Sequence, residues 1–480
     1  MSGIKRFILT SAQNNTPICP VTWASLKALS KHYNAGLIVG TFTYNKNSLG
    51  ARGAKRGTEG GDDGLWWDAA ITPHIVDKRV RLAPGLEWCG EMQVLPTAEN
   101  PLSGMEGYTG RQSSIFPHPK VALKSVPSGK NEPVKFMYTT GAVTGPSYIA
   151  KKAGLKATFH HSLGGLLVEY HPERGWFCRQ LHVNIGEQGS TLYDLNVLVK
   201  NGKVVGHPTK VEAIVWGDIH VNLIDPQFRD MAWEVSALGF PSVIDSLRPK
   251  YQFFHDLFDG HSIQKYAWKN KDHHEIYRAW KDSGLHVERE IDGVVGFLGH
   301  AARKNCKSII VNSNHDATLN HWLQNASHKT DPLNAIFYLE AELFLHRSED
   351  PDPSVLAWAI KRAKRKMNSK IGNYKVLKED ESFILCRDAN GGIECGMHGH
   401  RGPNGARGAI RNIARMGRKS VIGHSHTAGI FEGCYQVGLS GKLNMSYNRG
   451  PSSWSHTFCI IYPDGKRSLV TAHKGNWKAS

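Results

Sequence analysis

An apolar run passes directly into a carboxylate and an imidazole at residues 211–220, Val211-Glu212-Ala213-Ile214-Val215-Trp216-Gly217-Asp218-Ile219-His220. The apolar part predicts a short buried strand over Val211–Trp216. Asp218 and His220 are two residues apart, and alternate residues of an extended backbone share a face. The sequence therefore predicts that two chemically active side chains point to one side at the end of a strand.

The same arrangement recurs four times further along the chain. Apolar runs at Tyr251–Phe254, Ser308–Val311 and Ser420–Ile422 predict strands, and helical stretches separate them. The polar motifs that follow apolar runs are His255-Asp256-Leu257-Phe258-Asp259-Gly260, Asn312-Ser313-Asn314-His315-Asp316, Met397-His398-Gly399-His400 and Gly423-His424-Ser425-His426. This alternation predicts an α/β fold, a layered sheet with helices outside.

The residue types in these motifs suit divalent metal ions. Mixed Asp, Asn and His donors favour borderline-hard ions such as Mn²⁺ or Fe²⁺, whereas thiolates would favour zinc. Several such motifs on one sheet edge can hold two ions about 3.5–4 Å apart with one bridging carboxylate, an arrangement that activates water and clamps a phosphate. One motif alone is weak evidence, because a lone histidine is usually structural. Five motifs in this order, each at a strand end, predict a two-metal phosphoesterase site.

The order of the motifs resembles that of the calcineurin-like metallophosphoesterases, over roughly residues 208–475. The resemblance implies a four-layer α/β/β/α sandwich and two divalent ions, of which Mn²⁺ is expected and Mg²⁺, Fe or Zn²⁺ are alternatives. It implies that the first ion is held by Asp218, His220 and His426, the second by Asn314, His398 and His424, and both by Asp256. It also implies that His315 acts on the substrate phosphate or the leaving oxygen, and that Asp316 orients His315.

Some positions depart from the family pattern. His255 and Ser313 stand where the family usually has glycine. Gly260 stands where its protein phosphatases carry arginine, which argues against a phosphoprotein phosphatase; the segment is more similar to the superfamily's DNA-repair exonucleases. Two assignments stay open. Asp259 is the alternative to Asp256 as the bridging ligand, and His400 either replaces His398 or lies behind the ligands or against the substrate.

Charge and composition point to a polyanionic partner. The 480 residues include 59 Lys and Arg against 42 Asp and Glu, a net charge of +17, which favours a nucleic acid or an anionic membrane. Five arginines follow the fourth motif without an intervening acidic residue, at Arg401, Arg407, Arg411, Arg415 and Arg418. The last four recur at helical spacing, so we expect one helix face that contacts DNA phosphates. A solvated helix face is the alternative.

Several other classes of protein are excluded. No apolar run reaches eighteen residues, so we expect neither a membrane span nor a membrane partner. The apolar stretch near the N-terminus is too short for a secretory signal. Eight cysteines without close pairs, apart from Cys386 and Cys395, give neither a disulfide framework nor a CxxC zinc site. A cytoplasmic location fits this cysteine usage.

The first 206 residues carry no catalytic constellation. Lys5–Thr10 and Gly36–Tyr44 predict strands around a helix over Pro20–Asn34, and an Asn201-Gly202 turn predicts a hairpin at the end of a β-rich stretch. We place a boundary after residue 206, which divides the chain into a mixed α/β N-terminal domain, 1–206, and a catalytic domain, 207–480. The N-terminal domain is regulatory, DNA-holding or oligomerising, and a homo-oligomer stays open.

Two segments, Phe7–Thr16 and Val215–His220, resemble the pre-early deoxyribonucleases with which large tailed phages degrade host DNA. Together with the metal motifs, this resemblance implies a phage two-metal deoxyribonuclease without strong sequence specificity, acting on DNA in the infected host cytoplasm. A phosphomonoesterase or small-molecule phosphodiesterase is the alternative, but such an enzyme would not require the basic surface. A third hypothesis is a DNA-binding protein with an inactive metal site, and the complete set of predicted ligands argues against it.

Overall fold

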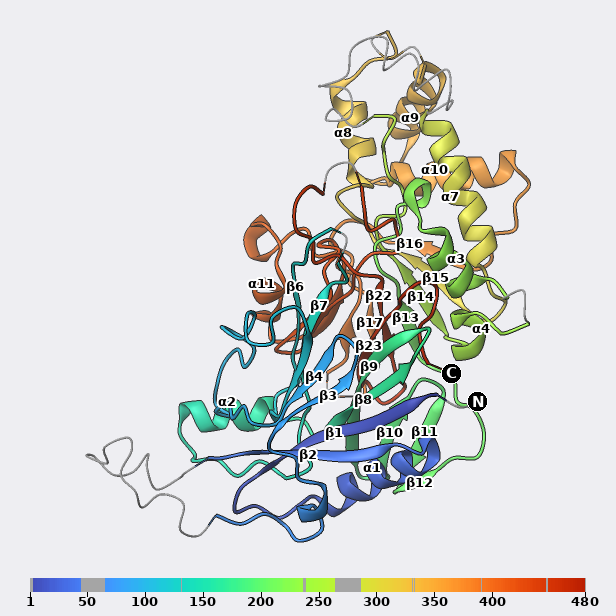
Figure 1. Ribbon diagram of the computed structural model, residues 1–480. Coiled ribbons are helices and arrows are strands. Elements are labelled where there is room, and N and C mark those ends of the chain that lie inside the picture. The colour runs from blue at the N-terminus through green and yellow to red at the C-terminus, as the bar shows by residue number, and fades with distance from the viewer. Residues whose placement is uncertain are drawn as a thin grey trace.

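The computed structural model describes residues 3–44, 65–130, 132–235, 239–263, 286–329, 331, 333–389, 391–445 and 448–479. These residues form a mixed α/β protein with three β-sheets and nine α-helices (Figure 1). In the described part of the chain, no helix is both long enough and apolar enough to cross a membrane.

A six-stranded sheet carries the strands that precede the first three motifs. Its order is β16-β15-β14-β13-β22-β23. Four strands are parallel, namely β13 (Ala213–Val215), β14 (Tyr251–Phe254), β15 (Lys307–Ile310) and β16 (Tyr374–Val376). Two antiparallel strands, β22 (Thr457–Ile461) and β23 (Arg467–Thr471), complete it. The strands predicted around residues 211–216, 251–254 and 308–311 are confirmed, although β13 is shorter than expected.

A ten-stranded sheet combines strands from distant parts of the sequence, in the order β17-β18-β19-β21-β20-β6-β7-β5-β4-β3. Its C-terminal members are β17 (Ile384–Leu385), β18 (Ile393–Glu394), β19 (Lys419–Ile422), β20 (Gly429–Phe431) and β21 (Cys434–Gln436). Its N-terminal members are β3 (Arg79–Ala83), β4 (Leu86–Cys89), β5 (Ser113–Phe116), β6 (Leu123–Val126) and β7 (Lys135–Thr139). Antiparallel pairing of β20 with β6 joins the two groups. The sheet thus contains strands from both sides of residue 206, and the domain boundary there stays a prediction.

These elements form layers, with two hydrophobic cores and one small hydrophobic cluster between them. The first core lies between the six-stranded sheet and six helices, α3 (Pro226–Trp233), α4 (Val243–Leu247), α7 (Val287–Ala301), α8 (Ala317–Asn325), α9 (Ala335–Arg347) and α10 (Val355–Lys366). The second core lies between the sheets; in β13, Val215 faces it whereas Ile214 faces the helices, as strand alternation requires. On the other face of the ten-stranded sheet, Ile413 of α11 (Ile410–Ala414) packs against Ile422.

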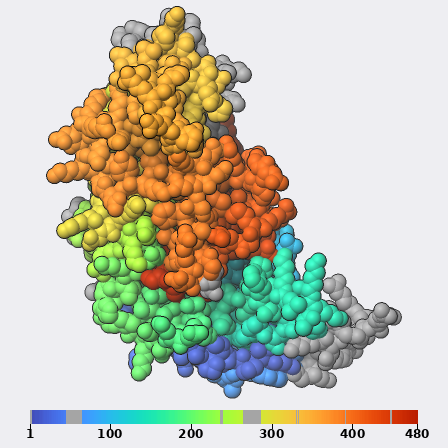
Figure 2. Space-filling model, turned by 180° about the vertical axis from the view of Figure 1, so that it is seen from behind, coloured from blue at the N-terminus to red at the C-terminus, as the bar shows by residue number. Residues whose placement is uncertain are grey.

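A seven-stranded sheet with helix α1 (Pro20–Tyr33) forms the remaining part, drawn at the bottom of Figure 1. Its strands are β1 (Lys5–Gln13), β2 (Gly36–Phe42), β8 (Gly164–His171), β9 (Gly175–Gly186), β10 (Gly189–Asp194), β11 (Val197–Lys200) and β12 (Lys203–Val204). The predicted strand–helix–strand start and the hairpin at Asn201-Gly202 are confirmed, and both turn residues have positive φ. Helix α2 (Lys152–His160) precedes β8. Seen from behind, the N-terminal residues form the base of the molecule (Figure 2).

Candidate metal centre

The five motifs meet where strand ends of the two packed sheets come together. Asp218 and His220 follow β13, Asp256 follows β14, and Asn314 follows β15 in the six-stranded sheet. His398 follows β18, and the pair His424 and His426 follows β19 in the ten-stranded sheet. The structure brings all seven predicted ligands into one cluster, because the carboxyl ends of these strands share an edge.

The backbone at these turns is held in an uncommon conformation. His220, Asp256, His424 and His426 all have φ between +46° and +75°. Non-glycine residues rarely adopt this left-handed region, and when they do they concentrate at functional sites. Four of the seven predicted ligands have this left-handed conformation. The uncommon backbone conformation is therefore found at the turns that carry the predicted ligands.

One group of donor atoms surrounds the end of β13. His220 Nε2 lies 3.1 Å from His426 Nε2 and 3.6 Å from Asp256 Oδ2. His426 Nε2 lies 3.3 Å from Asp218 Oδ2. Donor atoms bound to one ion at roughly 2.0–2.2 Å are separated by roughly 3–4 Å, so these four side chains have the spacing of one metal site.

A second group of donor atoms adjoins the first. Asn314 Oδ1 lies 3.0 Å from His398 Nε2 and 3.1 Å from His424 Nδ1. His398 Nε2 is also 3.4 Å from Asp256 Oδ1. Asp256 thus presents one carboxylate oxygen to each group. Asp259 instead places Oδ1 3.0 Å from His220 Nδ1, on the side of that ring away from the cluster. The geometry favours Asp256 as the shared ligand and Asp259 as the support of His220.

The buried carboxylates of the cluster need a nearby positive charge. Asp218 and Asp256 are almost fully buried, and among the described residues their ion pairs are all with imidazoles. Burial, with the nearby charge of Asp256, raises the pKa of Asp218 well above its ordinary value. Apart from the backbone amide of His424, neither carboxylate oxygen of Asp218 has a hydrogen-bond donor in the described part of the chain. Buried charges are usually paired or coordinate metals, so these residues fit two divalent ions.

Glycine makes room for this carboxylate. A Cβ at Gly423, the residue before His424, would lie 2.2 Å from Asp218 Oδ1 and 3.1 Å from Cγ of His255. Such distances leave no space for a side chain. The glycine that opens the fifth motif therefore allows Asp218 to approach the turn that carries His424 and His426.

Three imidazoles of the cluster are neutral, which is the form that binds metals. Burial lowers the pKa of His398 well below its ordinary value and the pKa of His426 to about 3, and it also lowers the pKa of His424. A histidine with a low pKa is neutral near pH 7, and the neutral ring offers a lone pair to a metal. These three histidines can therefore bind a metal without first losing a proton.

The remaining predicted site residues border the cluster. His315 is partly exposed, and its Nδ1 lies 3.1 Å from the carbonyl oxygen of Asp259. Burial opposes the charged form of His315, but Asp256, Asp259 and Asp316 outweigh it and raise the pKa. Asp316 accepts hydrogen bonds from Ser313 Oγ and from the amide of Phe258, and its role in orienting His315 stays a prediction.

His400 lies beside two of the second group's imidazoles. Its ring centroid is 5.5 Å from that of His398 and 6.1 Å from that of His424. Burial lowers the pKa of His400 to about 4, and Nδ1 is buried without a hydrogen-bond partner among the described residues. The ring therefore neighbours the second group of donors, while Asn314 Oδ1 and Asp256 Oδ1 both approach His398.

The prediction that four arginines form one helix face is wrong. Helix α11 spans only Ile410–Ala414, with Gly408 before it and Gly417, whose φ is +69°, after it, so of the four arginines at helical spacing only Arg411 lies within it. All five arginines are nevertheless exposed. The charge of Arg407 lowers the pKa of His424, and that of Arg401 lowers the pKa of His400. These two arginines thus lie close to the cluster, and Arg401 also pairs with Glu379.

A comparison of the whole chain with known proteins finds a phage relative. Over 492 aligned residues the chain is 35% identical to Protein A1 of Escherichia phage T5, covering 99% of this chain and 83% of that protein. The chain belongs to the Protein A1 family. No protein-family model and no solved structure matches it.

In this Protein A1 relative, the contacts of two residues with the site were not predicted from the sequence. His255 Nδ1 lies 3.3 Å from His398 Nδ1, so a residue that departs from the motif contacts a predicted ligand. Glu290 of α7 is buried and accepts hydrogen bonds from Asn222, His261 and Ser262, which ties the turns after two motifs to the helix. A glutamate among the buried positions of an amphipathic helix was the available signal.

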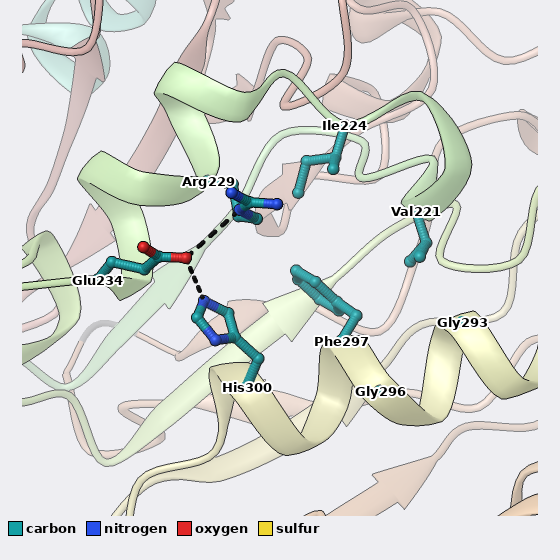
Figure 3. Close-up of a pocket in the computed structure, with 8 residues that line it drawn as sticks. All are labelled: Val221, Ile224, Arg229, Glu234, Gly293, Gly296, Phe297 and His300. Carbon is teal, nitrogen blue, oxygen red and sulfur yellow. Dashed lines mark ion pairs between the residues drawn. The ribbon is translucent and has the colours of Figure 1, made fainter.

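A separate pocket lies behind the turn that carries His220. It has a volume of about 370 Å³, and Val221, Ile224 and Phe297 line its apolar side. Glu234 crosses its rim, with Oε1 3.5 Å from Arg229 Nε and 3.4 Å from His300 Nε2 (Figure 3). None of the predicted site residues lines this pocket, so in this Protein A1 relative it is distinct from the metal centre.

Proposed function

We propose that the protein is a two-metal-dependent deoxyribonuclease that hydrolyses DNA phosphodiester bonds without strong sequence specificity. The observation that carries the proposal is the pair of adjoining donor groups that share Asp256, one oxygen to each. Dinuclear sites of this kind serve in-line displacement at phosphorus. The layered order of helices, six-stranded sheet, ten-stranded sheet and α11 supports a metallophosphoesterase sandwich.

The residues divide into those that hold ions and those that handle protons. Asp218, His220, Asp256 and His426 would hold one ion, and Asp256, Asn314, His398 and His424 the other. The bound ions would activate water and offset charge on the phosphate; Mn²⁺ is the ion that we expect, with Mg²⁺, Fe and Zn²⁺ as alternatives.

His315 would deliver a proton in the proposed reaction. Its Nδ1 can only donate to the carbonyl oxygen of Asp259, because a carbonyl has no proton to give. That bond holds the ring at the edge of the cluster, where His315 would exchange a proton with the substrate. The raised pKa of His315 keeps a larger fraction of the ring protonated near neutral pH, as a general acid requires.

DNA is the substrate class that the charge supports. Arg401 and Arg407 add positive charge beside the second donor group, and phosphate contacts dominate the affinity of proteins for DNA. Membership in a phage protein family supports a role in the infected host, where host DNA would be the substrate. A phosphomonoesterase or small-molecule phosphodiesterase is the alternative within the same chemistry.

Digestion of covalently closed circular DNA with added Mn²⁺ tests the proposal. The wild type should cut the circles, Asp256→Asn should not, and Asp352→Asn, an exposed carboxylate before α10, should cut like the wild type. Titration of Mn²⁺ into the metal-free proteins by calorimetry should show binding that Asp256→Asn weakens. Cleavage of a small phosphoester with no attack on circular or linear DNA would contradict the nuclease assignment.

A further inference from the structure

Helix α2 (Lys152–His160) presents an unusual surface. Leu155 is 58% exposed and Phe159 is 80% exposed, and residues four apart lie on one helix face. Lys151, Lys152 and Lys156 are exposed around them. The buried positions of the helix are small, Gly154 and Ala157. An exposed aromatic side chain among lysines is unnecessary for packing and is typical of surfaces that bind a partner.

The sequence around α2 lacks acidic residues, like the arginine segment. No Asp or Glu occurs from residue 133 to 168, a stretch that contains α2. None occurs from residue 395 to 431, the stretch that contains His398, the five arginines and His426. Acid-free stretches of this length leave their positive charge uncompensated along the chain, which favours a polyanion.

The two acid-free stretches meet in the structure at the turn between β20 and β21. Arg411 of α11 lies over the ring of Phe431, 5.3 Å from its centroid. The next residue, Glu432, ion-pairs with Lys156 of α2 at 3.2 Å, and Lys120 and His160 are also within 3.6 Å of it. In Figure 1, α2 and α11 lie on the same side of the molecule.

Charge around this junction remains positive. Glu432 and Glu99 are the carboxylates within 4 Å of the α2 cations in the described residues. Against them stand Lys151, Lys152 and Lys156 on the helix side, and four exposed arginines, Arg407, Arg411, Arg415 and Arg418, on the other. The arginine end of this surface reaches the turn of the fourth motif, because the amide of Gly408, next to Arg407, donates to the carbonyl oxygen of His400 at 2.9 Å.

From this continuity we propose that α2 and the Arg407–Arg418 segment form one surface that binds a single DNA strand leading to the metal centre. The lysines and arginines contact phosphates, and Phe159 and Leu155 contact an unpaired base. A single strand suits this surface better than a duplex, because an exposed aromatic ring stacks on an unpaired base without the cost of unstacking base pairs. The inference rests on the proposed nuclease function and gives the N-terminal region a DNA-holding role.

Binding of fluorescent single-stranded oligothymidine to the full-length Asp256→Asn protein, followed by anisotropy, tests the surface. Phe159→Ala should weaken binding about 5- to 100-fold, the range for loss of one stacked base. The double variant Lys151→Glu/Lys152→Glu should weaken binding and make it less dependent on salt. Two matched controls lie on α9 and α10, at the opposite end of the molecule (Figure 1): Ile336→Ala, another exposed apolar side chain, and Lys361→Glu/Arg365→Glu. Both controls should bind like the parent.

Each other outcome has a definite meaning. Unchanged binding by the α2 variants, with the parent binding well, overturns this surface while leaving the nuclease proposal intact. A parent that binds no DNA, together with a wild type that cuts none, contradicts the nuclease proposal itself. Phosphatidylglycerol vesicles provide the last comparison, because a basic helix with exposed apolar residues also suits membranes. Loss of vesicle binding with unchanged DNA binding would overturn the proposal in favour of a membrane surface. Circular dichroism of every variant separates these effects from misfolding.

Discussion

The Nδ1 atoms of His398 and His255 lie 3.3 Å apart inside the protein, where both rings are buried. Two neutral imidazoles at this distance share one proton, so one ring donates and the other accepts. His398 can offer Nε2 to a metal only if its proton is on Nδ1. That nitrogen then donates to His255, which fixes the ring of His398 with Nε2 toward Asn314 and Asp256. Hydrogen bonds of this type orient metal-binding histidines.

The first prediction concerns this contact. The calcineurin-like enzymes that the motifs resemble usually have glycine at this position, so we expect His255→Gly to fold. It should nevertheless bind Mn²⁺ about 10- to 100-fold more weakly by calorimetry, because His398 loses its partner. Imidazole added to the buffer should restore part of the affinity in the variant and none in the wild type. Wild-type affinity in His255→Gly without imidazole would show that the contact has no such role.

Gly423 gives a second prediction through the carboxylate beside it. In Gly423→Ala the new methyl group would lie 2.2 Å from Asp218 Oδ1, so that carboxylate must move away from His426. We expect at least one of the two Mn²⁺ ions to bind about tenfold or more weakly, since a first-sphere donor is displaced. Gly145→Ala is the control, because a Cβ there meets nothing within 4 Å. Equal Mn²⁺ titrations for the two variants would refute the steric argument.

Sequence patterns predicted the parts of the site that depend on local order. Strand ends predicted that the five motifs would meet at one place, but the period of two did not hold, because His220, His424 and His426 lie in left-handed turns and His424 and His426 belong to different donor groups. Contact between His255 and His398 was not predictable, because it depends on how β14 of one sheet faces β18 of the other. Pairing of β20 with β6 had no local signal either, since the two strands are about 300 residues apart. The helical spacing of the arginines gave a wrong prediction, because Gly408 and Gly417 lie at either end of a helix of only five residues.

A third prediction separates arginines near the metal centre from those elsewhere. Arg407→Ala should raise the KM for DNA and reduce the salt dependence of DNA binding by about one phosphate contact, because Arg407 acts on His424. Arg365→Ala, an exposed cation on α10, should change neither quantity. Both variants should be assayed over a range of NaCl concentrations. The same salt slope for Arg407→Ala and the wild type would remove Arg407 from the DNA-binding surface.

A buried charge network in the seven-stranded sheet contributes to the pH response of folding. Arg179 donates to Glu169 and to Asp194 at 2.7 Å each, and Arg6 donates to the second oxygen of Glu169 at 2.7 Å. Burial alone would raise the pKa of Glu169, but the two guanidinium groups outweigh it and lower the pKa to about 2. A pKa below the unfolded value of 4.5 means that the folded state favours the carboxylate.

The last prediction follows from the lowered pKa of Glu169. The contribution of ionised Glu169, about 3 kcal/mol from a shift of this size, should be fully present above pH 4.5 and disappear as the pH falls toward 2. Glu169→Gln should therefore lower the free energy of unfolding strongly at pH 7, where it leaves Arg179 short of a buried partner, and much less at pH 3. Urea denaturation of wild type and variant at both pH values measures this difference. Glu173→Gln, which alters an exposed carboxylate nearby, should have little effect at either pH. A gap between Glu169→Gln and the wild type that does not shrink at pH 3 would show that packing, and not charge, gives Glu169 its importance.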